Sequence, residues 1–143
     1  RLILLSYDDE GKFQTIDKEK WIFQDINTGI PLINKHNTLK YIPQMLNLDQ
    51  LNAISFSKGC YTGQEVVARV QHRGKVKQRL YQIKTESGVV ISPQEEVKNL
   101  DKKVGHVVIS KTHEDVCFGL AAINISQINN DLSVDGKSIK LIS

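Results

Sequence analysis

The spacing of apolar and polar residues differs between the two halves of the chain. At the start, an apolar run at 2–5 followed by the acidic, glycine-containing stretch 8–11 predicts a strand and a turn. Apolar residues then recur with helical spacing over 18–27, which predicts a short amphipathic helix. Gly29 and Pro31 end that helix, because neither residue type favours a continuing helix.

The middle of the chain is expected to consist of loops and short helices. Residues 30–47 contain two prolines and several asparagines and predict a loop, and 48–51 predict one helical turn capped by the preceding asparagine. A stripe of valines predicts a second helix at about 63–73. Thr62 and Glu65 have the spacing of a capping box, in which each side chain accepts a hydrogen bond from the other residue's backbone N–H.

The period changes to two in the second half. Segments rich in β-branched residues predict strands at 80–84, 89–91, 105–110 and 116–126. Residues 132–141 predict a hairpin with Asp135 and Gly136 at its turn. Short strands separated by turn residues predict a small closed antiparallel barrel of about five or six strands. The fold class is therefore α+β, with a domain boundary expected near Gly74.

Composition is that of an ordinary globular protein. Of the 143 residues, 40% are hydrophobic and 24% are charged, which argues against wholesale disorder. No stretch approaches the ~20 apolar residues that span a bilayer, so no membrane partner is expected. Two cysteines cannot form a disulfide framework or a four-ligand zinc site by themselves, which indicates a reducing compartment, the cytoplasm.

The net charge of +3 is unevenly distributed. The stretch 58–84 holds seven basic residues and one acid, for a net charge of +6, which leaves −3 for the rest of the chain. A candidate basic patch comprises Arg69, Arg73, Lys75, Lys77 and Arg79. Such a patch attracts phosphate backbones or another polyanionic ligand, or it is the solvated face of a helix and a strand. The charge pattern leaves both interpretations open.

Cys60 lies just before the predicted N-terminus of the second helix, between two glycines. Backbone N–H groups and the dipole at a helix N-terminus favour the thiolate, as Lys58 does if its side chain turns inward. Cys60 is therefore either a reactive or ligand-contacting thiol, or a small buried residue in a tight turn. The four histidines are scattered, so no general base for a cysteine hydrolase is evident. Cys117 is expected in the core, and Trp21 either in the core or stacked on a flat ligand.

Residues 58–65, with the sequence Lys-Gly-Cys-Tyr-Thr-Gly-Gln-Glu, resemble the signature of the YgfZ family, which are folate-binding proteins related to the T-protein of the glycine cleavage system. The signature residues are Lys58, Gly59, Cys60, Tyr61, Gly63, Gln64 and Glu65. Further matching segments follow in the family's order, at 29–33, 41–44, 47–48, 54–56, 67–69 and 73–74. The close resemblance covers about residues 18–79.

The resemblance implies that 1–74 is the C-terminal part of a T-protein-like folate-binding domain and that 75–143 is a C-terminal β-barrel domain. It implies that the chain is the C-terminal half of a longer protein, with tetrahydrofolate as cofactor. The signature cysteine falls on Cys60, the candidate essential thiol, and a folate-associated tryptophan falls on Trp21. Asn27 stands where many relatives have Glu, so that carboxylate is missing here. The chain alone is expected to bind folate weakly or not at all.

The function implied is that of a folate-binding accessory protein that supports the assembly or repair of iron–sulfur enzymes, including one that modifies tRNA. Its partners would be folate, those client enzymes and tRNA, with no stable metal site of its own, because a single thiol cannot hold a cluster. One alternative is a basic RNA-binding module without catalysis. The second is a T-protein-like aminomethyltransferase, which is weaker because the T-protein does not carry the Lys-Gly-Cys-Tyr signature.

Overall fold

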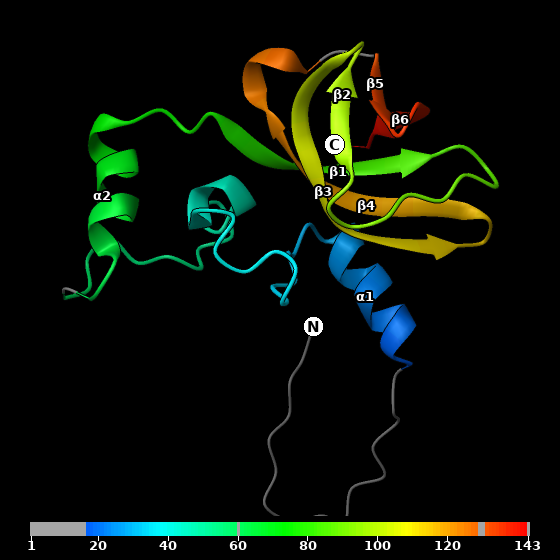
Figure 1. Cartoon of the computed structure of the whole chain (residues 1–143). Helices are drawn as coiled ribbons and strands as arrows, with labels where there is room; N and C mark the ends of the chain where they lie inside the picture. Colours follow the sequence, from blue (N-terminus) through cyan, green and yellow to red (C-terminus); the bar gives the residue numbers. More distant parts are fainter. Residues whose placement is uncertain (1–16, 60, 129–130, 143) are drawn as a thin grey trace, which may run out of the picture.

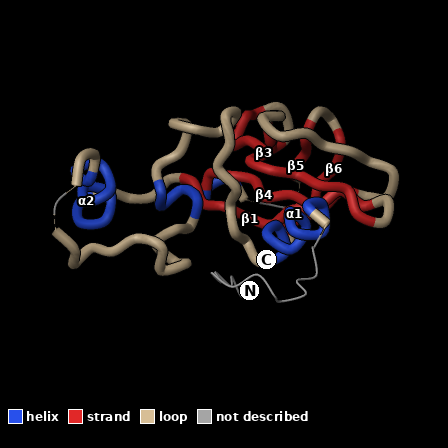
Figure 2. The backbone as a smooth tube through the Cα atoms, turned by 90° about the horizontal axis from the view of Figure 1, so that it is seen from below, coloured by secondary structure: helices blue, strands red, loops and turns tan. Residues whose placement is uncertain are grey.

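A computed structural model of the chain describes residues 17–59, 61–128 and 131–142 (Figure 1). The predicted strand at 2–5, the turn at 8–11 and Cys60 lie outside the described residues. A β-barrel forms the second half; the first helix lies against it, whereas the second helix lies farther away, at the left of both views (Figures 1 and 2).

The first half contains two α-helices and a short 3-10 helix. Helix α1 spans Lys18–Asn27, the 3-10 helix η1 spans Pro43–Leu46, and α2 spans Gln64–Arg73. Asp17 caps α1 by accepting a hydrogen bond from the backbone N–H of Glu19 at 3.0 Å. The sequence prediction of both α-helices is confirmed.

Six strands form the barrel, followed in places by tight turns. They are β1 Gln78–Thr85, β2 Glu96–Asn99, β3 Lys102–His113, β4 Val116–Asn124, β5 Leu132–Val134 and β6 Lys137–Leu141, with the 3-10 helix η2 at Ile125–Gln127. The order around the closed barrel is β1-β4-β3-β2-β5-β6, and every pair is antiparallel. The predicted small closed barrel is confirmed.

The last hairpin closes the barrel. β5 and β6 are joined by Asp135 and Gly136, whose φ angles of 49° and 73° match the positive values that a type I′ turn needs at both central positions. β6 then pairs with β1, and β5 pairs with β2. The predicted hairpin and its turn are confirmed.

The wall formed by β1, β4 and β3 is buried on both sides. Inside the barrel, an apolar cluster includes Ile83, Val107 and Ala121. Outside, Leu120 and Val108 belong to a second cluster, which packs beneath α1 and η1. Burial on both faces explains why β4 is almost continuously apolar in sequence instead of strictly alternating.

Two local features shape this wall. The pairing of β3 with β4 shifts between Val107 and Ile109, so that Val107 joins the inner cluster and the next two residues join the outer one. Gly105 lies where the strands approach most closely: a Cβ there would be 2.1 Å from the carbonyl oxygen of Ala122. Only glycine fits at this position.

Two sequence predictions of secondary structure were wrong. Residues 89–91 form no strand; Val90 is exposed and only Ile91 turns into the core, while β2 forms later, at Glu96–Asn99. Residues 48–51 form hydrogen-bonded turns and no capped helix, because the helical turn comes earlier, at η1. Asn47 is the C-cap of η1 in the left-handed conformation, with φ 58°.

Candidate functional site: the signature loop and its supports

The signature segment forms an exposed loop that leads into α2. Lys58, Gly59, Tyr61 and Gly63 are exposed, and Tyr61 keeps 51% of its surface accessible. Gln64 is half-buried and Glu65 is exposed in the first turn of the helix. The predicted thiol, Cys60, lies outside the described residues, so its accessibility stays a prediction.

The predicted capping box at the start of α2 is wrong. Gly63 is the N-cap, with φ 89°, and no side chain among the described residues caps the helix. Because the helix starts after Gly63, Glu65 is one position too early to bond back to Thr62. Gln64 closes the turn instead: its Oε1 accepts from the backbone N–H of Tyr61 at 3.3 Å, and its own N–H donates to the Tyr61 carbonyl at 3.2 Å. The first-turn N–H groups are thus left without a side-chain cap, an arrangement that favours an anion.

A buried glutamine in η1 is hydrogen-bonded to the backbone of α2. Gln44 in η1 is fully buried, and its Nε2 donates to the carbonyl of Val67 in α2 at 2.8 Å. Its Oε1 has no hydrogen-bond partner among the described residues. Sequence reasoning missed this role, although Gln44 belongs to one of the matching segments of the YgfZ resemblance; a polar residue between apolar neighbours was the available signal.

An ion pair joins the first half of the chain to the barrel. Arg79 in β1 binds Asp49 with two hydrogen bonds, at 2.6 and 3.0 Å, and also donates to the Gln44 carbonyl at 2.8 Å. The side chains are only 19% and 15% exposed. Burial alone would raise the pKa of the Asp49 carboxyl, but the hydrogen bonds and charge of Arg79, with backbone N–H groups, outweigh burial and lower it. Arg79 therefore joins the first half of the chain to β1, and its charge is paired instead of available to the basic patch.

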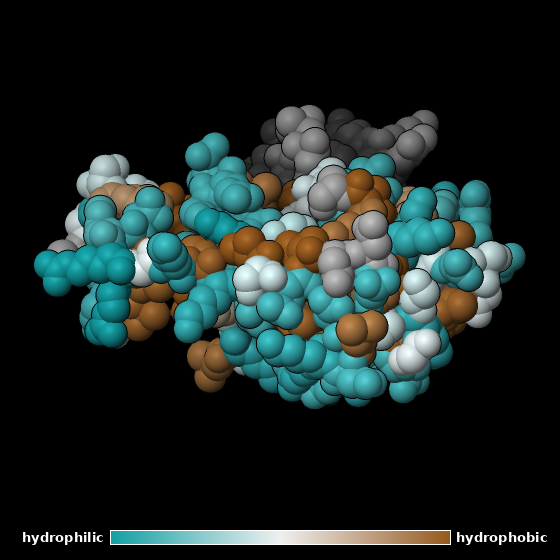
Figure 3. Space-filling model, turned by 90° about the horizontal axis from the view of Figure 1, so that it is seen from above, coloured by the Kyte–Doolittle hydropathy of each residue, from teal (hydrophilic) through white to brown (hydrophobic). Residues whose placement is uncertain are grey.

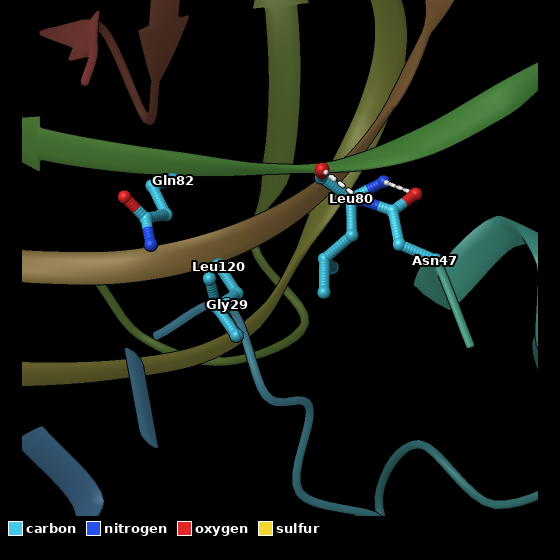
Figure 4. A pocket seen from close by; sticks show the side chains of 5 residues that line it. All are labelled: Gly29, Asn47, Leu80, Gln82 and Leu120. Atoms are coloured by element: carbon cyan, nitrogen blue, oxygen red, sulfur yellow. Dashed lines mark hydrogen bonds between the residues drawn. The ribbon is translucent and has the colours of Figure 1, made fainter. Parts of the chain in front are cut away.

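Asn47 also joins the first half of the chain to β1, beside a small cavity (Figure 4). Its amide donates to the carbonyl of Leu80 at 2.8 Å and accepts from the Leu80 N–H at 3.3 Å, as a neighbouring strand would. The cavity, about 140 Å³, is lined by Gly29, Asn47, Leu80, Gln82 and Leu120. Gln82 donates to the carbonyls of Ile26 and Asn27 at the end of α1, at 3.1 and 2.8 Å. The volume is below the 300–1,000 Å³ usual for cofactor pockets, so a folate does not fit there.

Trp21 lies on α1, half-buried. The helix packs on the barrel through Ile26, through Phe23 stacked on His113 with centroids 4.2 Å apart, and through a Glu19–Lys111 ion pair of 2.5 Å. α1 and α2 lie well apart in both backbone views (Figures 1 and 2). The described residues therefore do not bring Trp21 and the signature helix into one small-molecule pocket.

The other members of the basic patch are on the surface. Arg69 and Arg73 on α2, and Lys75 and Lys77 after it, are all exposed. Hydrophilic side chains cover much of the α2 end of the molecule, at the left of Figure 3. The structure thus leaves four of the five predicted bases exposed and places the fifth, Arg79, in the ion pair with Asp49.

The described residues contain no group of three or more histidine, cysteine, aspartate or glutamate residues that could hold a metal ion. Nor does any helix within them have the length and apolar character that crossing a bilayer requires.

Comparison with known proteins identifies the family. The tRNA-modifying protein YgfZ of Serratia proteamaculans (strain 568) is 38% identical to the chain over 125 residues, 85% of the chain and 37% of that protein. The protein of the same name from Yersinia pseudotuberculosis (serotype O:1b, strain IP 31758) is 36% identical over 129 residues, 87% of the chain and 38% of that protein. The chain belongs to the YgfZ family.

The match is limited in one respect. The chain spans about 38% of the length of the YgfZ proteins that it matches. No protein-family model matches it. The α+β fold with its closed barrel therefore corresponds to a part, and not to the whole, of each of these relatives.

Proposed function

We propose that the chain acts in tRNA modification as part of a folate-binding accessory protein that supports iron–sulfur enzymes in the cytoplasm, with Cys60 as the essential thiol. The relatives' name, tRNA-modifying protein YgfZ, supports the tRNA link. The observation that carries the thiol role is the exposed signature loop ahead of α2, whose first turn has no side-chain cap.

The setting suits a thiolate that reacts with a partner. A negative charge placed ahead of the first turn of α2 is stabilised by the helix dipole. The hydrogen bond from Gln44 to Val67 and the burial of Val67 hold α2 in place, so the loop projects from a fixed base. A single thiol supplies at most one ligand to a cluster, so the proposed contact is transient.

The proposed contact with tetrahydrofolate is Trp21, whose ring can stack on the flat ring system of the folate. The small cavity beside Asn47 is not lined by Trp21, and Asn27 presents no carboxylate at the position where many relatives have Glu. The proposed role is accordingly that of an accessory protein and not of an aminomethyltransferase.

The test replaces Cys60 with Ala or Ser in cells that depend on this protein, with the content of the enzymatically modified tRNA nucleosides as readout. Both variants should lower that content to the level of cells without the protein. Thr62→Ser, which keeps the loop and its thiol, is the matched control and should leave it unchanged. Normal nucleoside content with Cys60→Ala would refute the thiol role.

A further inference from the structure

The exposed cations around α2 are unpaired, unlike several elsewhere. Arg69, Arg73, Lys75 and Lys77, here called the α2 basic surface, form no ion pair or hydrogen bond through their side chains with the described residues. Four cations on the barrel are paired with acids instead, as Lys103–Glu96, Lys111–Glu19, Lys137–Asp135 and Lys140–Glu86. An unneutralised group of cations keeps its attraction for an external anion.

The surface is elongated. Arg69 and Arg73 are one helical turn apart on the same face of α2. At Gly74 the backbone becomes extended, with φ −109° and ψ 167°, so Lys75 and Lys77 follow with the two-residue spacing of one strand face. At ~1.5 Å per helical and ~3.3 Å per extended residue, Arg69 and Lys77 are about 20 Å apart along the chain.

An exposed aromatic ring lies at the N-terminal end of α2, whereas Lys75 and Lys77 follow its C-terminal end. Tyr61, 51% exposed, comes three residues before α2 begins. A flat ring beside a row of cations is the combination that single-stranded nucleic acids bind, with bases stacked on the ring and phosphates on the cations. A membrane-surface helix needs a broad face of large apolar residues, whereas α2 offers valines, of which Val67 is buried against η1.

We propose that the α2 basic surface binds an unpaired segment of tRNA, with phosphates on its four cations and an unstacked base on Tyr61. This inference rests on the proposed function, because tRNA is the RNA that function concerns. It adds a direct contact between the protein and the RNA, at a surface next to the signature loop.

The test is titration of a labelled, unmodified tRNA transcript with the 143-residue chain at 50 and 200 mM salt. Four phosphate contacts on a single strand give a slope of log affinity against log salt of about −2.8, or roughly 50-fold weaker binding at the higher salt. Lys75→Gln with Lys77→Gln should halve the slope, so that the same salt step weakens binding only about sevenfold. Tyr61→Ala should weaken binding about tenfold without changing the slope, and Tyr61→Phe should restore it.

The matched control removes the same charge elsewhere. Lys84 and Lys102 are exposed on the barrel and form no ion pair with another described residue. Lys84→Gln with Lys102→Gln should leave the slope unchanged. The inference is overturned if no binding occurs at 50 mM salt or if the control lowers the slope as much as the α2 variant. It is also overturned if vesicles with anionic lipid displace the RNA.

The two proposals fail separately. Cys60→Ala should bind the transcript with the wild-type slope while lowering nucleoside modification in cells. If Cys60→Ala lowers modification but the Lys75/Lys77 variant binds RNA as wild type does, the direct RNA contact is wrong and the accessory function stands. If the lysine variant loses binding and Cys60→Ala modifies normally, the reverse holds.

Discussion

The Arg79–Asp49 ion pair predicts how firmly the first half of the chain is held to the barrel. Arg79→Met keeps most of the apolar stem but removes two charge-assisted hydrogen bonds to Asp49 and one to the Gln44 carbonyl. Breaking a largely buried pair by removing one partner costs about 3–5 kcal/mol, and the 19% and 15% exposure of these side chains places the loss near the lower limit, at about 3 kcal/mol. For a chain of this length that lowers the melting temperature by about 10 °C.

Urea and thermal unfolding followed by circular dichroism measure the loss. The control is Lys103→Met, because the Lys103–Glu96 pair is equally short, at 2.7 Å, but its side chains are 50% and 45% exposed. That variant should lose less than about 1 kcal/mol. In the double variant Arg79→Met with Asp49→Leu, part of the stability should return, since no buried charge is left unpaired. If Arg79→Met unfolds within about 0.5 kcal/mol of wild type, the pair does not hold the two halves together.

Two further predictions concern the same fold. The pKa of Asp49 is lower in the folded chain than in the unfolded one, so its contribution to the free energy of unfolding is present above the ordinary aspartate pKa of about 3.9 and is lost as the pH falls through the lowered value. The difference in free energy of unfolding between wild type and Asp49→Asn should therefore narrow during acid titration, and a constant difference would contradict this. Gly105→Ala should prevent the barrel from forming or lower the free energy of urea unfolding by more than about 3 kcal/mol, since its Cβ would lie 2.1 Å from a backbone oxygen. Gly59→Ala is the control and should unfold like wild type, because a Cβ there has nothing within 4 Å. Equal stability of the two variants would show the reasoning to be wrong.

The sequence predicted elements whose local pattern matched their final environment. The helix at 18–27 and the hairpin at 132–141 carry their own signals, namely helical spacing ended by Gly29 and a turn at Asp135–Gly136. The strand at 89–91 was predicted from β-branched residues alone, but only Ile91 has a place in the core. β2 escaped prediction because Val97 is its single buried residue and the residues beside it are charged.

Long-range contacts decided what the sequence did not predict at the site. A run of bases in sequence gives no sign that Arg79 binds an aspartate thirty positions away while Arg73 and Lys75 stay exposed. The capping box had the correct spacing, yet Gly63 took the N-cap because its left-handed backbone suits the sharp entry into α2. Gln44 acquired its role only when the fold placed η1 under α2.

The closed order of the barrel also constrains how the protein is made. β1 needs β6 on one side and β2 needs β5, yet both partners belong to a hairpin that is synthesised after the other four strands. Until that hairpin emerges, a nascent chain carries two strand edges with unsatisfied backbone groups, which invite pairing with a neighbouring chain. A chain truncated before Leu132 therefore lacks both strands that close the barrel and is prone to aggregate, so the integrity of this fold depends on that hairpin.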